Sequence, residues 1–181
     1  MAGVVLIVDM LRGFLEEGYP LYCGPQARAI IPRVQSLLER ELARGSRLIF
    51  LCDHHRPDDL EFEMFPRHCV EGTPEVEVIP ELASYLGDLG EVMPKRRYSA
   101  FYGTPLAERL EELGAERLIV CGVCTDICVM HTAADARNRD YPVEVPADCV
   151  ASFDDRMHGF ALEHMEKVLG VKITGVQNGP A

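Results

Sequence analysis

Short apolar runs without a polar face recur along the chain and predict buried strands. The strongest of these runs stand at residues 3–8 (GVVLIV), 47–52 (RLIFLC) and 117–123 (RLIVCGV). A strand covered on both faces needs such a continuous run, whereas a half-exposed strand alternates apolar and polar residues. Weaker runs predict further strands near 91–93, at 141–145 and at 171–174.

The segments between these runs carry apolar residues at helical spacing. The apolar positions 30, 34, 37, 38 and 42 predict a helix over 25–44 that ends at Gly45. Further helices are predicted at 105–113 with Thr104 as N-cap, from Thr125 or Asp126 to about 138, and from Asp154 to about 167. Alternating buried strands and amphipathic helices predict a three-layer α/β fold, with a central, mostly parallel sheet of five or six strands.

One segment lacks any sustained period. Residues 54–80 are polar and contain four prolines, which predicts a long ordered loop. Loops of this length in compact domains usually carry function. The length of 181 residues fits one domain, 1–181, and its last four residues, 178–181, are expected to be frayed.

Composition narrows the class of protein. With 48% hydrophobic and 26% charged residues, the chain has enough apolar side chains for a core. A net charge of −11 argues against nucleic acid or an anionic membrane as the main partner. The sequence has neither a leader pattern nor an apolar stretch near the roughly 20 residues that span a bilayer. We therefore expect a cytoplasmic protein whose seven cysteines are reduced.

Chemically capable side chains stand where the predicted strands end. Asp9 follows the first strand, Asp53 the second, Lys95 the third, and the Cys124 to Cys128 turn follows the fourth. In open α/β sheets, ligands bind beyond the carboxyl ends of the strands. The sequence therefore predicts a carboxylate, an ammonium group and thiols at one edge of the sheet.

The thiols of Cys121, Cys124 and Cys128 allow three interpretations. They could pack under the next helix, which is the expectation for Cys121 inside its strand. They could hold a metal or cluster, although no fourth thiol stands at a suitable interval. One of them could instead be a nucleophile at a strand-to-helix turn, where a helix N-terminus and a lysine favour the thiolate.

A second cluster of polar residues begins at the end of the second strand. In extended chain, Asp53 and His55 point the same way, and His68 follows thirteen residues later. One carboxylate and two imidazoles suit zinc or another divalent metal. Spacing alone equally fits a polar loop with solvated histidines.

Taken together, the motifs resemble those of the isochorismatase-like cysteine hydrolases, and their nicotinamidase branch in particular. The match covers nearly the whole chain. It consists of V-D-x-x-x-x-F at 8–14, D-x-H at 53–55, F-P-x-H-C-V-x-G-T at 65–73, K-x-x-Y-S-A-F-x-G-T-x-L at 95–106 and G-V-x-T-D-x-C-V-x-x-T-A-x-D-A at 122–136.

The resemblance implies a catalytic triad of Asp9, Lys95 and Cys128, with Cys128 as the nucleophile. Asp9 would move the proton of the thiol, and Lys95 would hold the Asp9 carboxylate. The backbone N–H groups of Cys124 and Cys128 would form the oxyanion hole, with a cis peptide bond before Cys124.

The resemblance also implies a cofactor and a substrate. Asp53, His55 and His68, joined by Glu61 from the intervening loop, would hold one divalent ion at a metal-binding loop of about 53–80. Zinc is expected, with manganese or iron as alternatives. Phe14, Phe65 and Val123 would contact the substrate. The implied activity is deamidation of nicotinamide to nicotinate and ammonia in NAD salvage, by a homo-oligomer of two or four subunits.

Three departures from the family pattern keep other substrates open. The common D-x-Q-x-D-F opening has Leu11 and Gly13 at its polar positions, and Arg67 replaces a frequent proline before His68. A second hypothesis is therefore another amidase of the family, acting on a carbamoyl compound or a non-pyridine amide. A third, from a different class, is a non-catalytic protein that binds a metal through its thiols.

Overall fold

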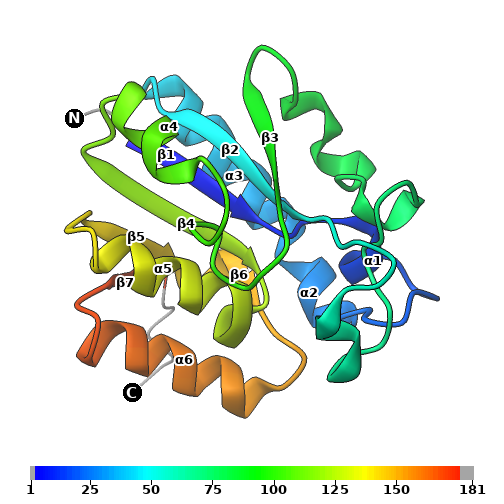
Figure 1. Cartoon of the computed structure of the whole chain (residues 1–181). Helices are drawn as coiled ribbons and strands as arrows, with labels where there is room; N and C mark the ends of the chain where they lie inside the picture. Colours follow the sequence, from blue (N-terminus) through cyan, green and yellow to red (C-terminus); the bar gives the residue numbers. More distant parts are fainter. Residues whose placement is uncertain (1–2, 176–181) are drawn as a thin grey trace.

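A parallel sheet runs through the centre of the computed structural model, which describes residues 3–175 (Figure 1). Over these residues the sheet has seven strands in the order β3-β2-β1-β4-β5-β7, with β6 beside β4. The strands are β1 (Gly3–Val8), β2 (Arg47–Asp53), β3 (Gly90–Lys95), β4 (Arg117–Val123), β5 (Val143–Pro146), β6 (Val150–Ala151) and β7 (Lys172–Thr174).

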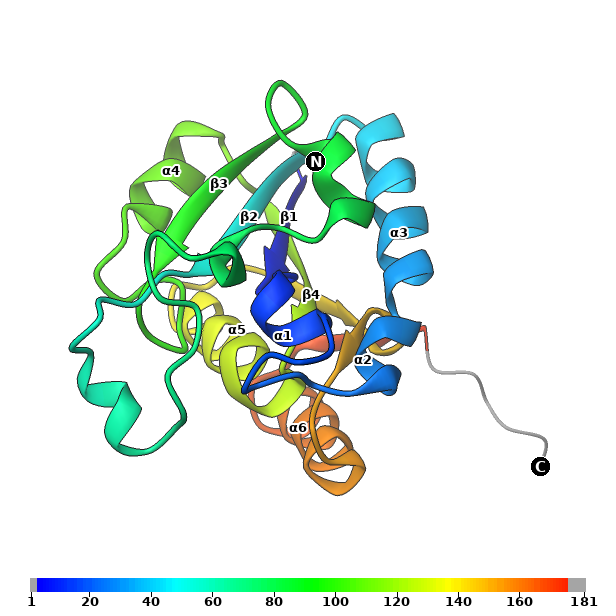
Figure 2. The ribbon, with the colours of Figure 1, turned by 90° about the vertical axis from the view of Figure 1, so that its right-hand side faces the viewer.

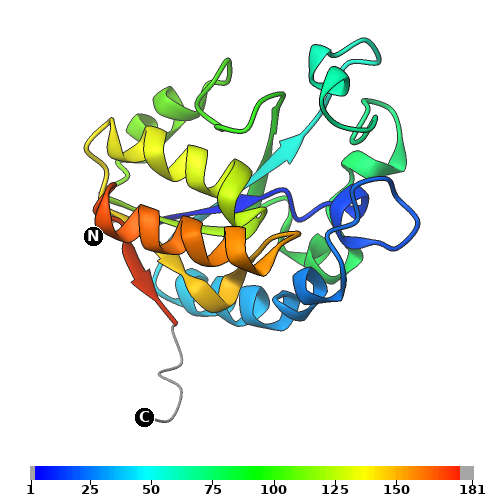
Figure 3. The ribbon, with the colours of Figure 1, turned by 90° about the horizontal axis from the view of Figure 1, so that it is seen from below.

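Helices cover both faces of this sheet. They are α1 (Arg12–Leu15), α2 (Pro25–Ala29), α3 (Ile31–Ala43), α4 (Leu106–Glu112), α5 (Met130–Arg137) and α6 (Asp155–Lys167). Figure 2 places α2 and α3 on one side and α4 and α5 on the other, and Figure 3 places α6 beside α5. Alternate residues of β1 join separate apolar clusters: Val5 packs with α3, and Leu6 packs with α4 and α5. The predicted three-layer fold is confirmed, and over the described residues its sheet has seven strands where five or six were predicted.

The order of the strands in the sheet determines which strand ends, and which polar side chains, lie next to one another. β1 lies between β2 and β4, so the sequence order of the strands reverses there and leaves a crevice at their carboxyl ends. The register aligns Val8 with Leu51 of β2 and with Gly122 of β4, and aligns Asp53 with Lys95. The ends of four neighbouring strands therefore meet at one place.

Two helix predictions need correction. The predicted helix over 25–44 is two helices, α2 and α3, divided at Ile30. Pro32 has no N–H to bond back to residue 28, so a continuous helix would lose a hydrogen bond there. The helix predicted from residue 105 begins one residue later, with Pro105 in the N-cap position, although Thr104 Oγ1 accepts the N–H of Leu106 at 3.3 Å.

Several short features were absent from the prediction. α1 and β6 have only four and two residues, and Thr125–Val129 forms a π-helical turn before α5. The predicted loop at 54–80 contains 3₁₀ turns at Leu60–Glu63 and Pro74–Val76, and a third turn, Pro80–Tyr85, begins at its last residue. The tail at 178–181 lies outside the described residues. Within residues 3–175, no helix combines the length and apolar character needed to cross a membrane.

Gly122 is required by the close contact between β4 and β1. Its φ is +111°, and a Cβ at this position would lie 2.0 Å from the carbonyl oxygen of Val8. Gly45 has a similar φ of +81° but open space around it. We expect Gly122→Ala to lower the melting temperature far more than Gly45→Ala, whose cost is limited to roughly 1–3 kcal/mol of backbone strain. Thermal unfolding followed by circular dichroism measures both, and equal shifts would contradict the close contact.

Candidate active site

Lys95 lies at the centre of the strand ends. It is 1% exposed. Its ammonium nitrogen is 2.9 Å from Asp9 Oδ2 and also contacts Asp53 Oδ1. Asp9 Oδ1 accepts the backbone N–H of Asp53 at 2.8 Å. The ends of β1, β2 and β3 are thus joined by one buried ion-pair network.

Cys128 completes this network from the turn after β4. Lys95 Nζ lies 3.4 Å from its Sγ atom. The Sγ atom and carboxylate oxygens of Asp9 and Asp53 all lie within 4.8 Å of one another. A carboxylate that can accept a proton, a fixed cation and a thiol are therefore within reach of one reacting carbon.

Burial and charge set the protonation of these groups. Burial raises the pKa of Asp9 to about 6, and the nearby Asp53 charge adds to the rise while Lys95 opposes it. Burial acts to lower the pKa of Lys95, but the carboxylates of Asp53 and Asp9 outweigh it and raise that pKa well above its usual value. Burial raises the pKa of Cys128 well above that of an ordinary thiol. The resting site therefore holds a protonated thiol beside a carboxylate whose pKa suits proton transfer near neutrality.

The thiols do not gather at one place. Cys121 packs in the apolar cluster on the α3 face of the sheet, whereas Cys128 belongs to the cluster on the α5 face. Cys124 Sγ lies 3.5 Å from Cys23 Sγ. Among the described residues, no metal-ligand group consists of thiols. This arrangement weighs against the thiol-metal hypothesis. The peptide bond between Val123 and Cys124 is cis, as the resemblance implies.

Three predicted metal ligands come together beside this network. Donor atoms of Asp53, His55 and His68 all lie within 4.8 Å of one another. Asp53 Oδ2 is 3.5 Å from His55 Nε2 and 3.8 Å from His68 Nε2. Glu61 Oε1 lies 3.9 and 3.8 Å from the same two nitrogens. All four residues are buried.

This donor set fits a divalent metal. His55 Nε2 is buried and has no hydrogen-bond partner among residues 3–175, although it faces two carboxylates. Burial, and next the charge of Asp53, raise the pKa of Glu61 to about 6. Two crowded carboxylates and two imidazole nitrogens match the ligands that zinc takes in proteins.

The thiol and the metal-ligand group open into the same narrow cavity. Asp9, Asp53, Glu61, His68 and Cys128 line it, together with Val123 and Cys124. Its apolar walls include Phe14 and Phe65, two of the predicted substrate contacts. They also include four residues absent from the prediction: Leu21, Tyr98, Ile127 and Phe153. A flat ring can pack between such aromatic walls.

The structure accounts for the three departures from the family motifs. Leu11 is fully buried and forms an antiparallel β-bridge with Val78. A Cβ on Gly13 would meet Cys69 Sγ at 2.9 Å, so a larger side chain does not fit there. The guanidinium of Arg67 lies over the ring of Phe62, 5.8 Å from its centre.

Together, the fold and the site define an α/β protein with a buried acid, lysine and thiol at its strand ends, an arrangement typical of cysteine hydrolases. The model of the isochorismatase domain matches residues 3–177. The chain belongs to the isochorismatase family.

Similar proteins include several amidases. The chain is 33% identical over 181 residues to PncA of Bacillus subtilis, an uncharacterized isochorismatase family protein, covering 96% of this chain and 99% of that one. A pyrazinamidase/nicotinamidase of Streptococcus mutans superposes with a TM-score of 0.90 at 34% identity, covering 95% and 99% of the two chains. A pyrazinamidase of Pyrococcus horikoshii in complex with zinc gives 0.88 at 31%, covering 97% and 100%. An N-carbamoylsarcosine amidase of Thermoplasma acidophilum gives 0.86 at 30%, covering 99% and 100%.

Proposed function

We propose that this protein is a metal-dependent nicotinamidase that deamidates nicotinamide to nicotinate and ammonia through a thioester on Cys128. The observation that carries the proposal is the cavity shared by Cys128, Asp53 and His68 between aromatic walls. A pyridine carboxamide has a carbonyl carbon for the thiol at one side of its ring and a ring nitrogen at another. The similar pyrazinamidase/nicotinamidase and the zinc complex support this choice.

In the first half of the proposed reaction, Asp9 removes the proton of the Cys128 thiol as Sγ attacks the amide carbon. Lys95, held between Asp9 and Asp53, stabilises the negative charge that forms. The backbone N–H groups of Cys124 and Cys128 would hold the oxyanion of the tetrahedral intermediate. Asp9 then passes the proton to the departing nitrogen, so that ammonia leaves and a thioester remains.

In the second half, Asp9 is again a carboxylate and removes a proton from water. The hydroxide attacks the thioester carbon, and the second tetrahedral intermediate collapses to the carboxylic acid. Sulfur leaves as the thiolate, which Asp9 reprotonates. Asp9 thus handles a proton in both halves, which requires a pKa near the working pH.

Asp53, His55, His68 and Glu61 would hold the metal. The ion supplies a positive charge that can accept the lone pair of a pyridine nitrogen. The metal-ligand residues would thereby orient the ring, while Phe14 and Phe65 would pack against its faces. We further propose that 1–181 acts as one domain. The dimer or tetramer and the cytoplasmic location stay predictions.

Ammonia release from nicotinamide tests the proposal directly. The purified protein, supplied in turn with zinc, manganese and iron, is incubated with nicotinamide, and ammonia and nicotinate are quantified. We expect equal amounts of the two products. No release with any of the three metals would contradict the proposed activity.

A second candidate is an amidase that acts on a carbamoyl compound. The similarity to the N-carbamoylsarcosine amidase favours it, as do Leu11 and Gly13 at two normally polar positions. N-carbamoylsarcosine assayed beside nicotinamide separates the two candidates. Turnover of N-carbamoylsarcosine with none of nicotinamide would establish the second candidate.

The metal-ligand assignment predicts a sharp difference between two histidines, His68 and His54. His68→Ala should lose the metal and raise KM for nicotinamide, because it removes a ligand nitrogen that lies on the substrate cavity. His54→Ala is the matched control, since His54 lines a different pocket. Elemental analysis after gel filtration measures metal per chain. Wild-type metal content in His68→Ala would overturn the ligand assignment.

A further inference from the structure

Asp59 is a buried carboxylate that the reaction above does not use. Its side chain is 4% exposed. It lies just before the 3₁₀ turn Leu60–Glu63, and its Oδ1 accepts the backbone N–H of Glu61 at 3.0 Å. Its Oδ2 lies 3.1 Å from His55 Nδ1. One carboxylate therefore contacts two of the four proposed ligand residues.

The contact with Asp59 determines which nitrogen of His55 is free. A neutral imidazole carries one N–H, and donating it from Nδ1 to a carboxylate leaves the lone pair on Nε2. Nε2 is the atom that faces Asp53 and Glu61 without a hydrogen-bond partner among the described residues. His68 is held in the same way by a different group, because its Nδ1 lies 2.8 Å from the carbonyl oxygen of Pro66.

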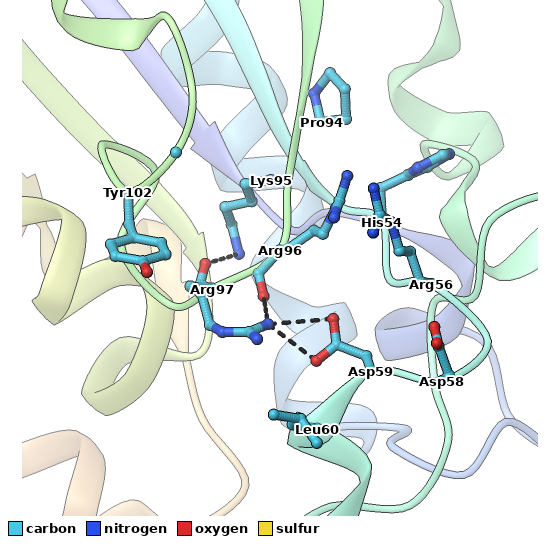
Figure 4. A pocket seen from close by; sticks show the side chains of 11 residues that line it. His54, Arg56, Asp58, Asp59, Leu60, Pro94, Lys95, Arg96, Arg97 and Tyr102 are labelled. Carbon is cyan, nitrogen blue, oxygen red and sulfur yellow. Dashed lines mark hydrogen bonds and ion pairs between the residues drawn. The ribbon is translucent and has the colours of Figure 1, made fainter.

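Arg97 also bonds to the Asp59 carboxylate. Its Nη1 donates to Asp59 Oδ1 at 3.0 Å and to Oδ2 at 3.2 Å (Figure 4). The backbone oxygen of Arg97 accepts a hydrogen bond from Lys95 Nζ at 3.2 Å. Arg97, the second residue after β3, is therefore bonded both to Lys95 and to the carboxylate that contacts His55.

Arg97 and Asp59 also line a wide polar pocket of about 510 Å³, separate from the substrate cavity. Figure 4 shows the Arg97 guanidinium spanning from its own strand end to Asp59, while Asp58 projects away from this contact. Arg96 and Asp58 line the same pocket, and neither has an ion-pair partner among residues 3–175. The chain thus offers an adjacent Arg and an adjacent Asp as controls.

We propose that Asp59 is a positioning residue for the metal site, which fixes the His55 tautomer and ring orientation, and that Arg97 holds Asp59 in place. The proposal rests on the metal site of the proposed function. Carboxylates behind metal-ligating histidines commonly contribute 10–100-fold, as an order of magnitude, to metal affinity. The contribution of Arg97 is smaller, because its side chain is 40% exposed and its ion pair is partly screened by solvent.

Zinc affinity, measured by competition with a chromophoric chelator, tests the proposal without reference to turnover. We expect Asp59→Asn to bind zinc roughly 10-fold or more weakly than the wild type. Asp58→Asn should match the wild type. Arg97→Ala should weaken binding by a smaller factor, and Arg96→Ala should leave it unchanged.

The nitrogen chemical shifts of the His55 ring provide a second measurement. They would not change if Asp59 only stabilised the fold. In the wild type with zinc, Nδ1 should carry the proton, and Asp59→Asn should broaden or shift that resonance while the His68 ring is unaffected. Asp59→Asn preserves the side-chain shape, so it serves even where Asp59→Ala fails to fold. Arg97→Ala supplies an independent test from a different element.

These measurements distinguish the positioning role of Asp59 from the metal site itself. Tight zinc binding by the wild type with equal affinity in Asp59→Asn and Asp58→Asn would overturn the positioning role and leave the proposed function standing. A wild-type protein that binds none of the three metals would refute the metal site of the proposed function, and the role of Asp59 with it.

Discussion

Replacing Cys128 with alanine is expected to abolish ammonia release from nicotinamide while leaving zinc content at the wild-type level. The Sγ atom forms the thioester in the proposed reaction, and no other thiol of the described residues has a hydrogen bond with Lys95. Loss of a catalytic nucleophile commonly lowers kcat by roughly 10⁴-fold or more. Turnover within tenfold of the wild type would refute the role of Cys128.

The controls for this variant exploit the other buried cysteines. Cys149 is as buried as Cys128 but does not line the substrate cavity. Cys149→Ala should therefore retain activity and lose only stability, because it leaves a small cavity in the core. Zinc content in Cys128→Ala distinguishes the enzyme from a thiol-metal protein: a metal held by Cys121, Cys124 and Cys128 would be lost with the thiol.

Much of the sheet could be predicted because a parallel strand buried on both faces imposes a continuous apolar run. This run is clear in three strands, β1, β2 and β4. The ends of β1 and β2 predict that Asp9 and Asp53 lie at the same edge of the sheet. β6 could not be predicted, because a strand of two residues is too short to show a hydrophobic pattern. It is a strand only through its pairing with β4. Pro32 predicts the break in the helix over 25–44, but the apolar positions keep helical spacing across it and favour one continuous helix.

The site was predictable only in part, because some of its residues lie in segments without a periodic pattern. Strand ends narrow the chemistry to one edge of the sheet, but the choice of Cys128 over Cys124 came from the family motif. Asp59 and Arg97 lie in segments without periodicity, 38 residues apart, and only the folded chain brings them together. Phe153 follows the unpredicted β6, so its place on the cavity left no signal in the sequence.

Asp9→Asn should lose nearly all turnover while the protein remains folded. Asparagine has almost the same shape, and its oxygen can still accept the backbone N–H of Asp53. It cannot take the thiol proton or activate water. One acid–base group contributes roughly 10²–10⁴-fold, and Asp9 would act in both halves of the reaction, so we expect the upper end of this range in kcat.

Stability gives the second readout for Asp9→Asn. The pKa of Asp9 is raised from 3.8 to about 6 in the folded protein, chiefly by burial. Ionising this carboxyl group therefore costs folding free energy as the pH rises through that interval, and the cost persists at neutral pH. Asparagine never ionises, so the variant should melt at neutral pH at a temperature no lower than the wild type. A folded variant with kcat within tenfold of the wild type would exclude Asp9 as the base, because the proposed reaction needs this carboxylate both to take the thiol proton and to activate water.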